Sequence, residues 1–233
     1  MSILGIRPSE PDVTMQVTRN SLEIESDEIA NADVEFWVRC LDPTGMLVAI
    51  AEPEPPAGNP KIVFVTSEVY GGNLGGLAGA DLKCNDLAGE AELPGDYKAW
   101  LSIPGTSVVD RFSKGGDPYL RVDGFTIAVD WADVIDGFID VPINRDENGI
   151  TPGGPPWVWT GTDHNGLPQE ATGRLRVDPI TGFCSDWTLD DGEHVGLLGE
   201  FFETGAGWTF GDIEGQLCGP AGNVNARLYC FEQ

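Results

Sequence analysis

Basic residues are scarce in this chain of 233 residues: 13 Lys and Arg stand against 38 Asp and Glu, so the formal net charge is −25 at pH 7. A charge of this sign repels phosphate backbones and anionic lipid surfaces over a screening length of ~10 Å. The sequence therefore argues against nucleic acid as a partner. Two interpretations of the acidity remain, solubility in a saline medium, which we favour, and binding of divalent cations.

Long hydrophobic runs are also missing. No stretch reaches the roughly 18 apolar residues of a transmembrane helix, so we expect no transmembrane segment. Residues 1–7 lack the basic and apolar regions of a secretory signal. If the cysteines form disulfides, we expect that a signal has been removed or that export uses another route.

Catalytic motifs are few. The two histidines, His164 and His194, have no Cys or Glu at metal-ligand spacing, and no Gly-x-Ser-x-Gly motif occurs. The glycines of Gly71–Gly76 lack the Lys-Ser/Thr of a phosphate-binding loop. Carboxylates are too numerous for a catalytic pair to be recognised among them. We therefore expect a protein that is not an enzyme.

Changes of pattern along the chain predict four parts. Residues 1–12 form a polar, proline-containing arm, and residues 13–51 alternate with period two, as three or four short antiparallel strands would. Residues 52–60 are a proline-dense linker, and residues 61–233 form the larger domain. The apolar fraction of 41% is ordinary for a folded protein.

The larger domain is organised around one amphipathic helix and the strand that follows it. Apolar residues recur at steps of three and four, which places them on one buried face: Leu77, Ala80, Cys84, Leu87, Ala88 and Ala91. The residues between them are expected on the solvated face: Asp81, Lys83, Asn85, Asp86, Glu90 and Glu92. Pro94-Gly95 predicts the stop, and Tyr97–Leu101 alternates as a short strand would.

Other elements of the larger domain are predicted more briefly. The sequence predicts a buried strand at 61–66, a hairpin over 119–128 that turns at Asp123-Gly124, and a short helix over 131–135. Further strands are predicted at 157–159 and 227–232. Residues 161–226 show few regular patterns and many glycines, so we expect them to be rich in loops.

Five cysteines occur in the chain. Cys84 is aimed at the core from the inner face of the helix, and Cys184, Cys218 and Cys230 are candidate partners. Four cysteines permit three pairings, and spacing alone does not choose among them. Cys40 is left over, unpaired or free to form an intermolecular link.

Several blocks, in order, resemble an endostatin-type domain: the helix with Cys84, residues 93–102, residues 158–166, Cys184-Ser185-Asp186-Trp187, and residues 228–232. They are most similar to a bacterial branch of secreted domains of unknown function within the C-type-lectin-like superfamily. The resemblance implies an α+β fold of that type for residues 61–233, and the period-two pattern of residues 13–51 adds a small N-terminal antiparallel β appendage. It also implies nested disulfides, Cys84 to Cys230 and Cys184 to Cys218.

Two acidic clusters are candidate calcium sites, and calcium is the only cofactor that the sequence suggests. Oxygen ligands gather beside glycine turns, as calcium prefers, at Asp146, Glu147 and Asn148 and at Asp190, Asp191 and Glu193. Neither cluster has the EF-hand spacing. Asp and Asn beside Gly are also ordinary turn residues, and we favour this second interpretation.

Seven tryptophans suggest stacking on carbohydrate. Those in the resembling blocks and strands are assigned to the core, whereas Trp131 and Trp208 are less constrained and are candidate ligand contacts, as are Asp163 and Asn165. The chain lacks the Glu-Pro-Asn or Gln-Pro-Asp triplet and the Trp-Asn-Asp triplet with which sugar-binding members of the superfamily usually hold calcium.

The resemblance implies an extracellular or cell-surface protein that binds a glycan or protein ligand, or serves adhesion. The alternative is a structural subunit that self-associates through its N-terminal β segment into an oligomer, a filament or a surface layer. A hydrolase with an unrecognised site is a more distant interpretation.

Overall fold

The structure is a computed structural model that describes residues 13–17, 22–26, 58–170, 182–191, 193–219 and 225–233. The chain divides into two compact units, residues 1–55 and residues 56–233. Their boundary falls within the proline-dense segment predicted as a linker. Among the described residues, no helix is both long and apolar enough to span a membrane.

The first unit contains one described hairpin. Strands β1 (Val13–Val17) and β2 (Leu22–Ser26) pair antiparallel, with Met15 opposite Ile24. Two of the predicted N-terminal strands are therefore present. The arm, the remaining strands predicted up to residue 51, and Cys40 lie outside the described residues.

A five-stranded sheet forms the centre of the second unit, in the order β4-β10-β3-β5-β6. Its strands are β3 (Lys61–Val65), β4 (Tyr97–Ala99), β5 (Tyr119–Arg121), β6 (Thr126–Ala128) and β10 (Tyr229–Glu232). The β3–β5 pair is parallel and the others are antiparallel. The mixed sheet and the helices beside it make the unit α+β, as expected.

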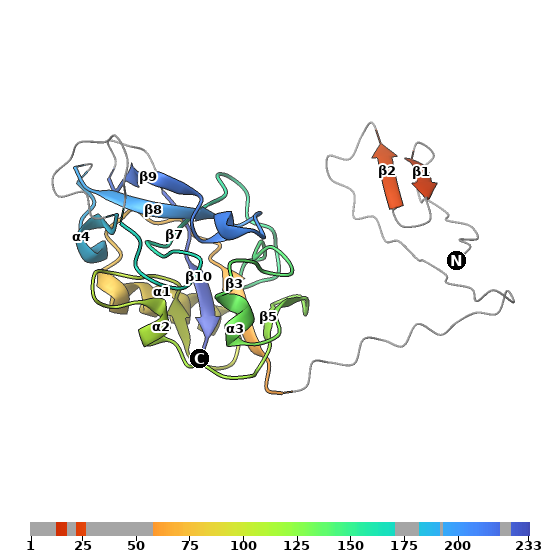
Figure 1. The fold of residues 1–233 in the computed structure, drawn as a ribbon, viewed down its shortest axis with the longest axis horizontal. Coiled ribbons are helices and arrows are strands. Elements are labelled where there is room, and N and C mark those ends of the chain that lie inside the picture. The colour runs from red at the N-terminus through yellow and green to blue at the C-terminus, as the bar shows by residue number, and fades with distance from the viewer. Residues whose placement is uncertain (1–12, 18–21, 27–57, 171–181, 192, 220–224) are drawn as a thin grey trace, which may run out of the picture. The chain divides into compact units, whose positions relative to one another are not determined.

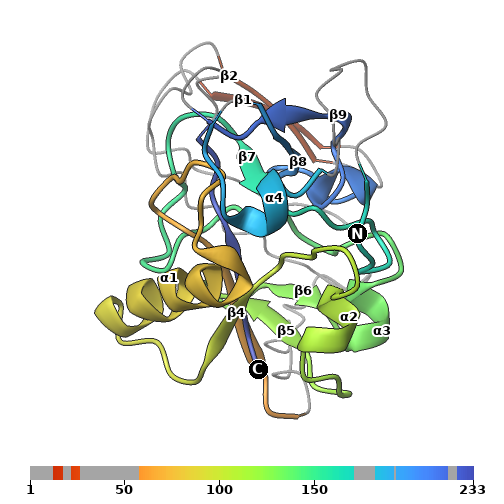
Figure 2. The same cartoon turned by 90° about the vertical axis from the view of Figure 1, so that its left-hand side faces the viewer.

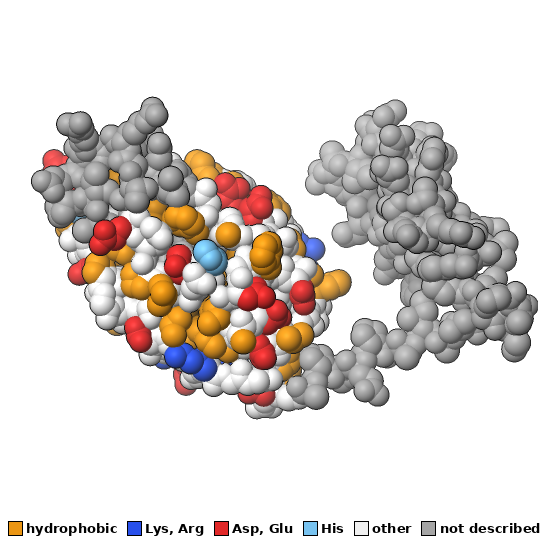
Figure 3. All heavy atoms as spheres, viewed as in Figure 1, with side chains coloured by type: hydrophobic (Ala, Val, Ile, Leu, Met, Phe, Trp, Pro, Cys, Tyr) orange, Lys and Arg blue, Asp and Glu red, His pale blue; other side chains and the backbone are white. Residues whose placement is uncertain are grey.

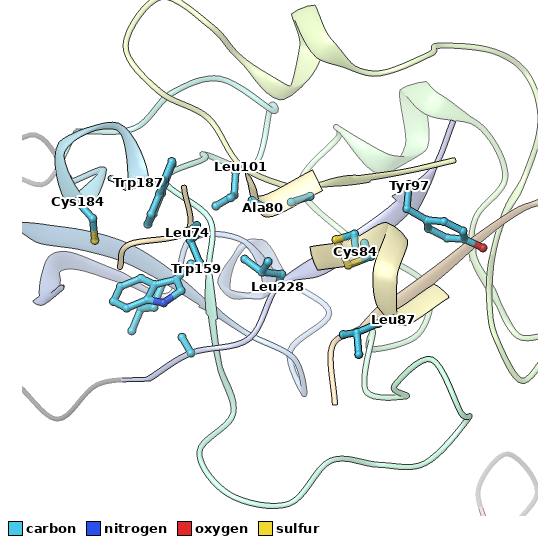
Figure 4. Close-up of a cluster of buried hydrophobic side chains, with 14 of the residues drawn as sticks. Leu74, Ala80, Cys84, Leu87, Tyr97, Leu101, Trp159, Cys184, Trp187 and Leu228 are labelled. Carbon is cyan, nitrogen blue, oxygen red and sulfur yellow. A yellow bond between two sulfur atoms is a disulfide. The ribbon is translucent and has the colours of Figure 1, made fainter. Parts of the chain in front are cut away.

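Helix α1 (Gly76–Glu90) matches the predicted amphipathic helix closely. Its buried residues Ala80, Cys84, Leu87 and Ala88 belong to a core cluster that includes Trp159 and Trp187. Figure 4 shows Cys84, Ala80 and Leu228 in this cluster, with Trp187 and Trp159 farther along it. The helix ends at Glu90, before the predicted Pro94-Gly95 stop.

Two residues of α1 differ from the prediction of a solvated face, because they cover the edge of the sheet. The Asn85 carboxamide accepts a hydrogen bond from the Tyr97 N–H (2.8 Å) and donates one to the Tyr97 carbonyl oxygen (2.7 Å). The Asp81 carboxylate accepts the Ala99 N–H (2.9 Å) and pairs with Arg111. The backbone groups on the outer edge of strand β4, away from β10, therefore find their hydrogen-bond partners on helix α1.

A second sheet, in the order β7-β8-β9, contains β7 (Trp157–Trp159), β8 (Val195–Glu200) and β9 (Asp212–Leu217). Figures 1 and 2 show this sheet with α4 (Cys184–Trp187) at one end of the unit, and α1 with the five-stranded sheet at the other. The expectation that residues 161–226 are loop-rich is therefore wrong for β8 and β9. Short helices α2 (Val108–Arg111) and α3 (Trp131–Val134) and the 3₁₀ turn η1 (Ala206–Trp208) complete the unit.

Two disulfides join distant parts of the second unit. Cys84 bonds to Cys230, with 5.5 Å between Cα atoms, and Cys184 bonds to Cys218, with 5.6 Å. These are the pairs that the resemblance implies. In the chain-entropy model, closing loops of these lengths stabilises the fold by at most about 5 and about 4 kcal/mol respectively.

We expect Asn85→Ala to destabilise the second unit by about 2 kcal/mol, because it leaves the N–H and carbonyl of Tyr97 without their partner. Asp86→Ala, at an exposed position on the same helix, is the matched control and should change the free energy of unfolding by less than about 0.5 kcal/mol. Urea denaturation of both variants measures the difference. Equal stabilities would show that the covered edge contributes nothing.

Candidate functional site

The long connection between β7 and β8, residues 160–194, is fixed to the core where it begins. The Thr160 hydroxyl donates to the Thr209 carbonyl oxygen (2.6 Å), and the Thr162 hydroxyl lies 2.9 Å from that of Ser102. The side chains of Thr160, Thr162 and Ser102 are fully buried. Their hydroxyls pair with one another or with backbone, so the start of the connection is rigidly held.

The returning part of the connection contains α4, a single helical turn with left-handed backbone. Four consecutive residues other than glycine have positive φ: Cys184 (46°), Ser185 (50°), Asp186 (56°) and Trp187 (62°). Left-handed helix costs an L-residue roughly 1–2 kcal/mol, because Cβ approaches the following carbonyl oxygen. Such strain persists only where surrounding structure holds it, and it is common at functional sites.

Both ends of the left-handed turn are anchored in the core. Cys184 is fully buried and cross-linked to Cys218, and Trp187 is fully buried with its indole N–H donating to the Ser102 carbonyl oxygen (2.9 Å). The Leu74 N–H donates to the Trp187 carbonyl oxygen (2.9 Å). Figure 4 shows Trp187 close to Leu74, with Cys184 nearby at the other end of the same turn.

The sulfur of Cys184 fits between two glycines. A Cβ at Gly72 would lie 2.5 Å from this sulfur, and a Cβ at Gly196 would lie 2.7 Å from it. Both distances are far below contact distance, so neither position accepts a side chain without a shift of the disulfide. The disulfide between Cys184 and Cys218 and the left-handed turn are thus packed too closely against their neighbours to adopt a different arrangement.

Ser185 and Asp186 form the tip of the turn, where Ser185 is half-buried and Asp186 is exposed. Sequence reasoning missed them as site residues, because Cys184-Ser185-Asp186-Trp187 contains neither the glycine nor the asparagine that usually indicates positive φ. An exposed carboxylate on a fixed backbone can accept hydrogen bonds from a ligand, or pair with a cation, without a loop having to be ordered first.

A pair of side chains follows the turn. Asp191 accepts hydrogen bonds from the N–H groups of Glu193 (2.9 Å) and His194 (3.2 Å), and its carboxylate lies 2.9 Å from the His194 ring nitrogen Nδ1. The side-chain hydrogen bond to His194, aided by the backbone bonds, lowers the pKa of Asp191 to about 2. Asp191 therefore stays ionised at neutral pH and holds Glu193 and His194 in place through these hydrogen bonds.

The predicted ligand contacts Asp163 and Asn165 lie in a tight turn near the start of the connection. One Asp163 carboxylate oxygen accepts the N–H groups of Asn165 (2.9 Å) and Leu167 (2.9 Å), which makes Asp163 a turn residue. The Asn165 side chain is exposed and lies 3.2 Å from the His164 ring. Asn165 is the member of this pair that a ligand could reach.

The predicted calcium ligands Asp146, Glu147 and Asn148 are already engaged. One Asp146 oxygen accepts the N–H groups of Asn148 (3.0 Å) and Ile150 (2.9 Å), and Glu147 accepts the Ser67 N–H (3.0 Å). Asp146 and Glu147 are only 5% exposed. The carboxylates of this cluster therefore stabilise the turn at residues 146–150 and the backbone that follows β3.

Arg227 lies near these two carboxylates. It donates to the carbonyl oxygens of Thr66, Ser67 and Gly153, and is 5% exposed. Burial lowers the pKa of Arg227, and the charges of Asp146 and Glu147 partly offset this effect. A buried guanidinium beside the two acids disfavours a further cation there.

The second acidic cluster is likewise spread over different contacts. Asp191 pairs with His194, whereas the Asp190 carboxylate lies over Gly71, where a Cβ would come within 2.6 Å of it. In the part of the chain that the structure describes, no group of three or more His, Cys, Asp or Glu side chains could hold a metal ion.

The assignment of Trp131 and Trp208 as ligand contacts is wrong. Trp208 is fully buried, with ring centroids 4.8 Å from Trp100 and 5.6 Å from Tyr229, and Trp131 is 7% exposed. Their large apolar rings join one aromatic core around Trp100 and Phe231 and leave no face for a sugar.

Comparisons of the sequence with known protein families and with characterised proteins find no match. The geometry of the described residues is therefore what supports an assignment of function.

We expect Asp186→Gly to raise the free energy of unfolding by about 0.5–1 kcal/mol, because glycine adopts positive φ without steric cost. Asp86→Gly, the same change within right-handed α1, should instead lower it by about 1 kcal/mol. Thermal and urea unfolding measure both variants. A stability loss for Asp186→Gly as large as that for Asp86→Gly would contradict a strained left-handed turn.

Acid should weaken the Asp191–His194 contact in a defined window. The pKa of Asp191 is about 2 in the folded chain and about 3.9 in an unfolded one. The stability from this group is therefore fully present above about pH 4 and is lost as the pH falls through about 2. The difference in melting temperature between wild type and Asp191→Asn should shrink across this window. A difference that is constant from about pH 5 to 2 would contradict the contact.

Proposed function

We propose that this chain is a non-enzymatic ligand-binding protein of the extracellular space or cell surface, built on a C-type-lectin-like domain. The left-handed turn is the observation that carries the proposal: a strained, close-packed turn presents the exposed carboxylate of Asp186 on the connection between β7 and β8. A glycan or protein ligand would be recognised there.

Topology supports the C-type-lectin-like assignment. The first and last strands of the second unit, β3 and β10, are neighbours, and a disulfide ties α1 to β10. A separate small sheet carries the long connection, which the inner disulfide fastens to the start of the loop after β9. This arrangement fastens both ends of the connection to a fixed framework, as in folds whose loops carry binding residues.

Two disulfides also support the proposed location. Disulfides persist in oxidising compartments and are rare in the cytosol. Both are fully buried at all four cysteines, so they serve structure. A surface of strong negative charge suits a protein that works in a saline medium outside the cell.

A glycan array tests the carbohydrate form of this proposal. We expect the full chain to bind a discrete set of glycans and Asp186→Asn, which keeps the shape of the side chain but removes its charge, to bind them about tenfold more weakly. Asp86→Asn on α1 is the matched control and should bind as wild type does. Parallel arrays with calcium and with a chelator show whether the metal takes part.

Three outcomes would count against the site. Binding that Asp186→Asn and Asp86→Asn weaken equally would reflect overall charge. If neither variant changed the affinity for the glycans, recognition would lie elsewhere on the protein. Absence of any glycan bound above background would reject a carbohydrate ligand.

A further inference from the structure

Two exposed phenylalanines lie on adjoining segments of the second unit. Phe138, in the loop after α3, is 68% exposed, and Phe202, in the turn after β8, is 51% exposed. The Ile139 N–H donates to the Thr204 carbonyl oxygen (2.9 Å), and the Phe138 ring lies 3.9 Å from the position of a Cβ on Gly205. The two segments therefore run side by side.

Both rings are held outward by a fixed backbone. Phe138 follows Gly137, whose φ is 105°, and its N–H donates to the Asp136 carboxylate (3.0 Å), whereas the next residue, Ile139, is buried. Phe202 follows Phe201, which is fully buried and lies 4.5 Å from it between ring centroids. Water-exposed aromatic rings on rigid backbone are the usual anchors of a protein interface.

Three carboxylates flank these two phenylalanines in the sequence. Asp136, Asp140 and Glu203 are exposed and belong to the same two segments. Within the described ranges, no ion pair joins any of the three to a basic side chain. Arg121, which reaches the Pro142 carbonyl oxygen, is already paired with Asp123. One face of the molecule, in Figure 3, shows this combination broadly: hydrophobic side chains lie among carboxylates, with few basic groups.

We propose that Phe138, Phe202, Asp136, Asp140 and Glu203 form a docking surface for a Lys- and Arg-rich segment of a partner protein. Charge complementarity selects this occupant: uncompensated carboxylates attract cations, and a net charge of −25 repels anionic surfaces and other acidic chains. The faces of the two rings accept guanidinium and ammonium groups through cation–π contacts. This surface does not include the left-handed turn, so the inference is independent of the proposed function.

Fluorescence anisotropy with a labelled oligoarginine peptide tests the docking surface in the full chain. We expect saturable binding that weakens at least about tenfold in the double variant Phe138→Ser/Phe202→Ser, because hot-spot aromatics are lost. The matched control is Leu82→Ser, which removes a side chain 60% exposed on α1 and should leave binding unchanged. Circular dichroism confirms that each variant is folded.

Two further measurements define the chemistry. Asp140→Asn/Glu203→Gln should also weaken binding, and raising the salt concentration from about 0.1 M to about 0.5 M should weaken binding to the wild type more than to this variant. An oligoglutamate peptide should not bind.

Several results would overturn the proposal. Equal binding by wild type and the double phenylalanine variant would mean that overall charge alone attracts the peptide. Absence of saturable binding, or equal binding of oligoglutamate, would exclude a basic partner. Light scattering that shows a dimer of wild type, and a monomer of the double phenylalanine variant, would assign the surface to a second copy of this chain.

Discussion

The pairing of β3 with β10 is the constraint on which the second unit depends. Residue Phe64 lies opposite Cys230, and Cys230 in turn lies opposite Ala99 of β4, so the last strand is inserted between two early ones. Bringing β3 and β10 together closes nearly the whole second unit into one loop, and this costs conformational entropy before any contact is gained. The disulfide from Cys84 to Cys230 lowers that cost, because it joins β10 covalently to α1, which lies between β3 and β4 in the sequence.

Strand β10 also separates the two larger core clusters of the second unit. Phe231 and Tyr229 turn toward one aromatic core with Trp100 and Trp208, whereas Cys230 and Leu228 face the cluster beneath α1. One strand therefore has a buried face on each side, and the two clusters pack against opposite faces of a single sheet. The second sheet joins this arrangement where Val158 of β7 forms a β-bridge with Arg227, two residues before β10 begins.

Elements with a clear apolar period were predictable from sequence, and those without one were not. The helix around Cys84 and the terminal strand show their period in the residues themselves, and the hairpin over residues 119–128 shows its turn residues, Asp123-Gly124. Strand β8 is buried along nearly its whole length and contains two glycines, so its residues do not alternate. Side-chain direction was least predictable: Trp208 is buried by contacts with Trp100, which lies far away in sequence.

The candidate site was predictable only in part. Its disulfide framework came from a resemblance, but the conformation of Ser185 and Asp186 is imposed by tertiary anchors and has no local signature. The acidic clusters illustrate the opposite error. Composition shows how many carboxylates are present. It does not show that the carboxylate oxygens of Asp146 and Asp191 accept hydrogen bonds from neighbouring backbone N–H groups.

The two disulfides are nested, with Cys184 and Cys218 both lying between Cys84 and Cys230. A single cut by a protease anywhere between Cys84 and Cys230 therefore leaves both fragments covalently joined. A second cut releases a peptide only if the stretch between the two cuts carries no linked cysteine, or carries both members of a pair. Under oxidising conditions the domain can thus be nicked in its surface loops and still retain its framework in one piece.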